Sequence, residues 1–213
     1  MKYTFKPNVK YLGEVEIDDD FRYEPMFFGA DISFVKKHSK GVTSKIVSVL
    51  EDFNVNMFLP KGYNFLIDTR VNMLMKGFYP SIPGWHCDDF SRGENGQPDM
   101  EYDENVKHYM VLLSDNDSDL SGTEFVTEAF TCDLDSGNVW KSLNCHVEQN
   151  KYETRKLETG KIIEFDQNCV HRATEALSNG WRLFFRASIT KRDVKNEIRN
   201  QTQTYVDLNT IGW

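Results

Sequence analysis

The sequence lacks any long hydrophobic run, and this absence limits what the protein can be. No part of its 213 residues approaches eighteen consecutive apolar residues, so no transmembrane helix is predicted. Residues 1–7 have neither the apolar run nor the small-residue cleavage site of a secretory signal, and we expect a cytoplasmic location. Repeats and Pro/Gly/Ser-rich linkers are also missing, which predicts a single domain over residues 1–213.

Cysteine is scarce, and the four residues are scattered without a CxxC pair: Cys87, Cys132, Cys145 and Cys169. A chain of this length folds without disulfide bonds, so we expect reduced thiols that are buried as small apolar side chains. A zinc site that combines them with His86 and His146 is the alternative, although the spacing lacks the paired cysteines of structural zinc sites.

Basic residues are fewer than acidic ones, and the formal net charge is −8. A protein that coats nucleic acid neutralises phosphates with Lys and Arg, so nucleic acid is the less expected partner, although a local basic groove is compatible with this balance. The composition favours a small molecule or a protein residue as substrate, with no membrane partner, and it leaves the oligomeric state open.

Residues 30–54 have the pattern of two helices. Asp31 is a candidate N-cap of a short helix that ends near Gly41. Thr43 is a candidate cap of a second helix, whose apolar residues form a helical stripe: Ile46, Val47, Val49, Leu50 and Phe53.

From residue 63 onward the pattern changes to short β-like segments separated by turns. Strands are predicted within residues 64–75, 106–113, 123–127, 160–165 and 182–190. Between them lie a loop (91–105), an acidic turn (114–119) and a polar excursion (131–152). The tail 191–213 is polar and ends in the segment 205–213, which is a candidate for docking on the barrel or on another subunit. Many short strands after a helical start predict a mainly β sandwich or barrel, with helices buttressing one sheet.

An imidazole and a carboxylate stand two residues apart in His86-Cys87-Asp88. On an extended backbone these two side chains point to the same face and can hold one cation together. His171 follows a predicted strand and precedes a hairpin, which makes it the best third ligand. Two imidazoles and one carboxylate are the ligand set of non-haem Fe(II) oxygenases.

The strand 182–190 alternates in character. Leu183, Phe185, Ala187 and Ile189 share an apolar face, so Arg182 and Arg186 lie on the opposite face and point into the barrel when the apolar face packs on the helices. A buried guanidinium needs an anion. For Arg186 an internal salt bridge and an anionic ligand are equally expected, whereas for Arg182 the ligand is favoured.

Four features occur in order over residues 64–190: His86-Cys87-Asp88, Gly122-Thr123-Glu124-Phe125, Gly160 to Phe165 leading to His171, and Arg182 beyond a short hairpin. In this order they resemble the Fe(II)- and 2-oxoglutarate-dependent dioxygenases. The resemblance implies a double-stranded β-helix, a jelly-roll-like barrel, with Fe(II) held by His86, Asp88 and His171. It also implies 2-oxoglutarate and dioxygen as cosubstrates, hydroxylation of an unactivated carbon, and release of succinate and carbon dioxide.

The resemblance has departures. Many members of the family carry a serine two residues after the arginine that binds the C5 carboxylate of 2-oxoglutarate; here Phe184 follows Arg182, whereas Ser188 follows Arg186. Arg182 is the favoured carboxylate ligand and Arg186 the alternative. Tyr109 is a candidate hydroxyl donor to 2-oxoglutarate, with a core tyrosine as the other interpretation.

Substrate choice is expected to depend on loops 91–105 and 131–152 and on aromatic residues near the mouth: Trp85, Phe90 and Trp181. Two other classes of protein remain open. One is a non-catalytic metal-binding β-barrel module, and the other is a cupin-like metalloenzyme that does not use 2-oxoglutarate.

Overall fold

Antiparallel β-sheet makes up most of the computed structural model, which describes residues 1–16, 20–55, 59–81, 83–115 and 120–199. The mainly β class predicted from the sequence is therefore confirmed. The larger sheet has the strand order β2-β9-β5-β11-β4. Its strands are β2 (Lys10–Glu14), β9 (Lys161–Asp166), β5 (Lys107–Ser114), β11 (Gly180–Thr190) and β4 (Asn64–Leu74).

Three smaller sheets complete the β structure. One has the strand order β10-β6-β8, and the other two are the pairs β1-β7 and β12-β3. None of these sheets closes into a barrel within the described ranges. Their strands are β10 (His171–Ala173), β6 (Thr123–Val126), β8 (Thr154–Lys156), β1 (Lys2–Phe5), β7 (Phe130–Asp133), β12 (Glu197–Arg199) and β3 (Met26–Phe28).

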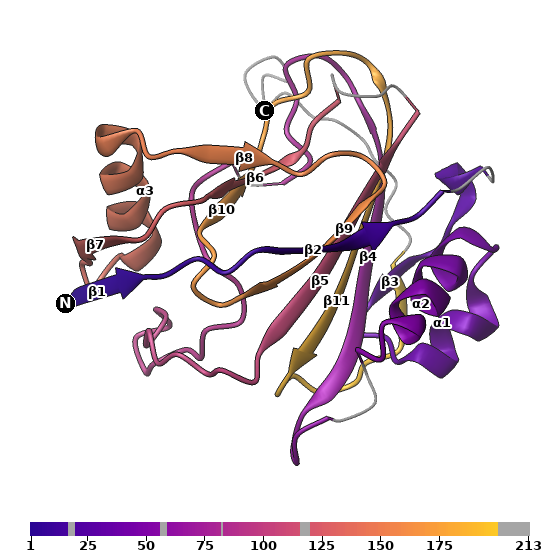
Figure 1. Ribbon diagram of the computed structural model, residues 1–213, viewed down its shortest axis with the longest axis horizontal. Helices are drawn as coiled ribbons and strands as arrows, with labels where there is room; N and C mark the ends of the chain where they lie inside the picture. Colours follow the sequence, from indigo (N-terminus) through magenta and orange to yellow (C-terminus); the bar gives the residue numbers. More distant parts are fainter. Residues whose placement is uncertain (17–19, 56–58, 82, 116–119, 200–213) are drawn as a thin grey trace, which may run out of the picture.

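Two helices cover one face of the larger sheet, as predicted (Figure 1). They are α1 (Ile32–His38) and α2 (Val42–Asp52), and a short 3-10 turn, η1 (Phe21–Tyr23), precedes them. Their apolar side chains, such as Val35 and Ile46, pack with strands β4, β5 and β11 in one buried core. Burial of this apolar stripe holds the helices to the sheet.

The starts of the two helices are capped in different ways. Asp31 caps α1 as predicted, because its carboxylate accepts from the backbone N–H of Phe34 at 2.8 Å. Thr43 is not the cap of α2, which begins one residue earlier. The buried carboxylate of Glu24 accepts there instead, from the Val42 N–H at 2.9 Å and from the Thr43 hydroxyl at 2.7 Å.

A third helix, α3 (Val139–Asn150), occupies most of the segment that the sequence predicted to be a polar excursion. Val139, Leu143 and Val147 are spaced by four residues and are buried. They pack in a second core with Trp85 and Phe90. In Figure 1, α3 lies beside β7, on the opposite side of the molecule from α1 and α2.

Strand β11 alternates as predicted. Leu183, Phe185, Ala187 and Ile189 all belong to the core beneath the helices. Arg182 and Arg186 project from the other face and line a cavity between the larger sheet and β10. The period of two along one strand therefore separates a hydrophobic face from a cationic one.

None of the helices in the described ranges is long and apolar enough to cross a membrane. Two expectations lie partly or wholly outside the described residues. The acidic turn 114–119 is described only at residues 114 and 115, and the docking of the terminal segment 205–213 falls within residues 200–213.

Candidate metal centre

His86, Asp88 and His171 come together as predicted. One nitrogen or oxygen atom from each lies within 4.8 Å of the other two. The backbone produces this convergence, because His86 and His171 form an antiparallel bridge. Each backbone nitrogen donates to the other residue's carbonyl oxygen, and the N to O distances are 3.0 and 2.9 Å. Directly opposed residues of an antiparallel pair project to the same face, and the two imidazole centroids are 4.7 Å apart.

Backbone carbonyls orient both imidazoles. His86 Nδ1 lies 2.7 Å from the carbonyl oxygen of Gly84, and His171 Nδ1 lies 2.9 Å from that of Cys169. A carbonyl oxygen only accepts, so each Nδ1 carries a proton, and in the neutral imidazole Nε2 is then the nitrogen that can bind a metal. Nε2 of His171 lies 3.3 Å from Oδ2 of Asp88.

The protonation states also suit a divalent cation. Burial and the neighbouring His171 lower the pKa of His86, which favours the neutral ligand form. Burial raises the pKa of Asp88, but the charges of Arg186 and His171 outweigh it and hold that pKa well below its usual range. The shifts therefore favour a neutral imidazole at His86 and an ionised carboxylate at Asp88.

Arg186 is committed to internal partners. Its Nη1 donates to Asp88, and its Nη2 lies 3.2 Å from Oδ2 of Asp68 on β4. Asp68 also accepts from Arg192 at 2.9 Å and from the backbone N–H of Gly29 at 2.9 Å. Of the two alternatives that the sequence left open for Arg186, the structure has the internal salt bridge. This salt bridge holds Asp88 toward the two histidines.

Arg182 has the opposite character. It is 4% exposed, and its side chain forms no ion pair or hydrogen bond with any residue in the described ranges. Its guanidinium carbon lies 5.6 Å from the centre of the Phe184 ring. Burial, followed by repulsion from Arg70, lowers the pKa of Arg182. An unpaired buried guanidinium is unfavourable until an anion reaches it.

The candidate metal ligands and the two arginines of β11 line one cavity of about 240 Å³. The lining includes His86, Asp88, His171, Arg182 and Arg186. A volume of this size accommodates a small molecule. The metal-ligand group and the unpaired guanidinium therefore face the same cavity.

The structure does not bring Tyr109 into this cavity. It pairs with Ala187 on β11 and packs beside Phe65 in the core under the helices. Burial and the carboxylate of Glu164 raise the pKa of Tyr109. Tyr109 lies on the helix-facing side of β5, and of the two sequence interpretations the core tyrosine agrees with this placement.

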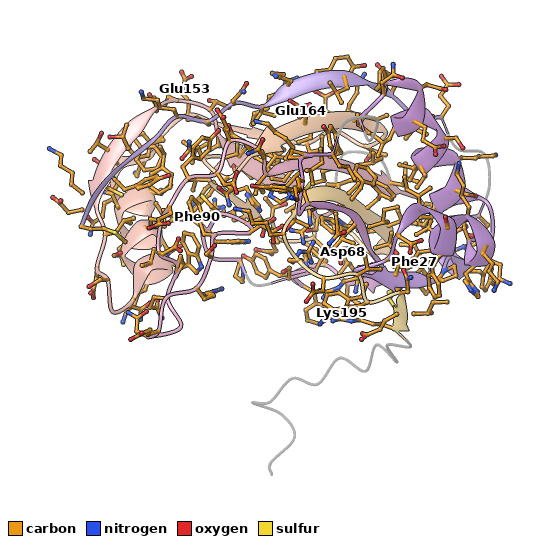
Figure 2. All side chains as sticks on the ribbon, turned by 90° about the horizontal axis from the view of Figure 1, so that it is seen from below. Phe27, Asp68, Phe90, Glu153, Glu164 and Lys195 are labelled. Atoms are coloured by element: carbon orange, nitrogen blue, oxygen red, sulfur yellow. The ribbon has the colours of Figure 1, made fainter. Side chains whose placement is uncertain are left out.

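The aromatic residues expected at the mouth pack elsewhere. Trp85 and Phe90 are buried beside α3, and Trp181 packs against the helix-side core. Figure 2 shows Phe90 toward α3 and Asp68 nearer the middle of the molecule. The cavity wall is formed instead by residues that sequence reasoning missed: Phe28 on β3, Asp68 and Arg70 on β4, and Arg199 on β12.

His108 was also missed. It is fully buried on the cavity-facing side of β5, and its Nδ1 lies 2.9 Å from the Ser188 hydroxyl. Its Nε2 has no hydrogen-bond partner in the described residues. Burial lowers the pKa of His108 to about 4. The signal for it in the sequence was strand alternation, which places His108 and Met110 on the face opposite Tyr109.

No family model matches this sequence, and no curated protein matches it. Among solved structures, an N-substituted L-amino acid dioxygenase from Burkholderia ambifaria AMMD gives a TM-score of 0.34 at 14% identity, over 56% of this chain and 47% of that one. Its structure in complex with alpha-KG gives 0.36 at 13% identity, over 72% and 66%. The chain thus spans between about half and two thirds of that protein. Overlaps this limited carry no argument about activity, which must come from the residues of this chain.

Proposed function

We propose that this protein is an Fe(II)- and 2-oxoglutarate-dependent dioxygenase that hydroxylates an unactivated carbon of a small molecule or a protein residue. One observation carries the proposal. A single cavity contains a His-Asp-His group whose ligand atoms lie within 4.8 Å of one another and, on another wall, a buried guanidinium whose Nε has no partner in the described residues. Either feature alone also occurs in proteins of other classes, but a metal with an anionic chelating cosubstrate accounts for both.

The donor set suits Fe(II). Two imidazole nitrogens and one carboxylate on one side of a metal leave positions open for other ligands. His86, Asp88 and His171 are the residues that would hold the ion. The carbonyl contacts at Gly84 and Cys169 and the Arg186 contact to Asp88 orient these ligands before the metal arrives.

Arg182 suits the C5 carboxylate of 2-oxoglutarate. Its guanidinium is buried, carries an unpartnered Nε and faces the cavity from the same strand as Arg186. A carboxylate can accept two parallel hydrogen bonds from such a group. Arg186 is less suited to this role because its Nη1 and Nη2 already donate to Asp88 and Asp68.

We also propose that the five-stranded sheet β2-β9-β5-β11-β4 and the three-stranded sheet β10-β6-β8 are the halves of a double-stranded β-helix. We propose further that residues 1–213 form one domain. The chain alternates between sheets in support of this: β5 belongs to the larger sheet, β6 and β8 to the smaller, β9 to the larger, β10 to the smaller and β11 to the larger. The His86 bridge adds a further segment to β10. Alternation of this kind is the connection pattern of a jelly roll.

The roles of the chain's own residues follow from their positions. Fe(II) with 2-oxoglutarate and dioxygen supplies oxidising chemistry when bound, and hydroxylation with release of succinate and carbon dioxide is the outcome that we propose. His86, Asp88 and His171 set the geometry of the metal. Arg182 orients the cosubstrate, and the apolar side chains of Met110 and Phe184 help to exclude water from the cavity.

The test is an anaerobic titration of the protein with Fe(II) and 2-oxoglutarate, followed by absorbance for the metal-to-ligand charge-transfer band and then, in air, by succinate detection. The band is expected in the parent protein and is expected to vanish in His171→Ala. His146→Ala is the matched control, because His146 lies on α3 and contacts Tyr152, away from the cavity. A band of unchanged intensity in His171→Ala removes His171 from the metal site.

The same titration separates the two other classes of protein. A metal-binding module without activity would give no succinate from 2-oxoglutarate. A metalloenzyme of the cupin kind would bind the metal but give no charge-transfer band with 2-oxoglutarate. Either result would overturn the proposed reaction.

A further inference from the structure

Two more arginines line the cavity beyond Arg182. Arg70 projects from β4, and Arg199 projects from β12 at the end of the chain that the structure describes. No carboxylate of the described residues forms an ion pair with either. The acidic side chains in the cavity wall, Asp68 and Asp88, are occupied by Arg186 and Arg192.

Neutral contacts hold both guanidinium groups in place. Nη1 of Arg70 donates to the carbonyl oxygen of Pro80 at 3.0 Å. The guanidinium carbon of Arg199 lies 3.3 Å from the centre of the Phe28 ring. Strand pairing between β3 and β12 brings this ring and this guanidinium together. Such contacts orient a cation without neutralising its charge.

The three arginines form one electrostatic cluster. Burial and the charge of Arg199 lower the pKa of Arg70, and burial and the charge of Arg70 lower the pKa of Arg182. Exposure increases along the series, since Arg182 is buried, Arg70 is half-buried and Arg199 is exposed. The positive charge thus runs from the interior of the cavity to its mouth.

One dicarboxylate cosubstrate does not neutralise this cluster. Its C5 carboxylate would satisfy Arg182, and its other end would lie at the metal. Arg70 and Arg199 would remain charged and close together near the mouth. Guanidinium groups that repel one another and lack internal acids are an arrangement that an anionic ligand stabilises.

We propose that Arg70 and Arg199 bind an anionic group, a carboxylate or a phosphate, on the molecule that is oxidised. Phe28 and Phe184, which line the same cavity, contact its apolar part. This assignment rests on the proposed function and makes it more specific: the substrate is a small organic anion whose charge lies at the mouth and whose reacting carbon lies toward His86, Asp88 and His171.

The test uses three probes of equal chain length, hexanoate, hexyl phosphate and hexanamide, titrated calorimetrically into the full protein under anaerobic conditions with Fe(II) and saturating 2-oxoglutarate. Saturation with the cosubstrate occupies Arg182, so the probes report on the remaining cations. At least one anion is expected to bind about tenfold or more tightly than hexanamide. The ratio between hexanoate and hexyl phosphate identifies carboxylate or phosphate as the preferred group.

Variants assign the effect to residues. Arg70→Gln and Arg199→Gln are each expected to weaken anion binding about tenfold while 2-oxoglutarate affinity changes by less than about twofold. Arg70→Lys keeps the charge and is expected to lose less, which guards against misfolding in the Gln variant. Lys195→Gln is the matched control, because Lys195 also lies over the Phe28 ring, at 4.9 Å, but does not line the cavity.

Failure of this inference is distinguishable from failure of the proposed function. Equal binding of all three probes, no binding of either anion, or unchanged anion affinity in Arg70→Gln and Arg199→Gln would overturn the anion site even if 2-oxoglutarate binds. Absence of 2-oxoglutarate binding would overturn the oxygenase. In that case anion binding to the metal-free protein, lost in the same two variants, would still support the anion site.

Discussion

The two ends of the cavity differ in how their charges are balanced. At one end Arg186 and Arg192 face Asp68 and Asp88, and the positive and negative groups pair within the protein. At the other end Arg182 has no acidic partner among the described residues, although it lies four residues from Arg186 on the same strand face. The same residue type is therefore paired with acids at one position of the strand and unpaired at another.

Internal pairing and the lack of it have different consequences. A paired guanidinium is part of the folded structure, and its removal leaves buried carboxylates without a counter-charge. An unpaired one is unfavourable in the folded protein until an anion reaches it, so its removal should not destabilise the fold. This comparison predicts opposite effects for the same substitution at positions 186 and 182.

The largest effect is expected for Arg186→Met. The change leaves Asp88 and Asp68 partly buried with fewer counter-charges, so the free energy of unfolding of the metal-free protein should fall by about 3–5 kcal/mol. Urea unfolding measures it. Arg155→Met is the matched control, because Arg155 forms an exposed pair with Glu158 and its loss should change stability by less than about 1 kcal/mol. If Arg186→Met lowers the free energy of unfolding by less than about 1 kcal/mol, the pairing of Arg186 with Asp68 and Asp88 does not stabilise the fold.

Acidification should destabilise the folded protein through His108. Burial lowers the folded-state pKa of His108 to about 4, below the unfolded value of about 6.5. Between these values the unfolded chain binds more protons, so stability is full above about pH 6.5 and falls as the pH drops toward 4, by about 3 kcal/mol in all.

Urea unfolding of the metal-free protein at several pH values tests this dependence. The slope between pH 6.5 and 4 should be reduced in His108→Asn and retained in His146→Gln. If the slope is the same in all three proteins, His108 is not the group that couples folding to protons.

Arg182→Met should reduce the affinity for 2-oxoglutarate by about ten- to a hundredfold, because it removes hydrogen bonds to a charged group worth about 1.5–3 kcal/mol. Its effect on the stability of the metal-free protein should be neutral or favourable, unlike that of Arg186→Met. Anaerobic titration with Fe(II) measures the affinity. A larger loss in Arg186→Met or in Arg70→Gln would move the C5 carboxylate to that residue.

The features that the sequence predicted are those encoded by short-range alternation. The period of two in β11 separated its arginines from its apolar residues, and the same rule placed His86 and Asp88 on one face. His171 followed from its position between a strand and a hairpin. These inferences need only local backbone geometry, so they were available without a structure.

The features that were missed depend on contacts between distant segments. The capping of α2 by Glu24 and the stacking of Arg199 on Phe28 require tertiary pairing that no local pattern encodes. Helix α3 is a different case. Val139, Leu143 and Val147 recur every four residues, but the polar residues among them weakened the signal, and packing against the core around Trp85 provides the burial.

The smallest effect is expected for Tyr109→Phe, and it tests alternation on the neighbouring strand. Tyr109 faces the helix-side core, whereas Met110 faces the cavity. Removal of the hydroxyl should therefore change 2-oxoglutarate affinity by less than about twofold and lower the free energy of unfolding by about 1 kcal/mol through the lost contact with Glu164. The same anaerobic titration and urea unfolding measure both. A tenfold fall in affinity would mean that β5 presents its other face to the cosubstrate. His108 and Met110 would then face the helix-side core, because a one-residue slip exchanges every side chain of a strand between the two faces.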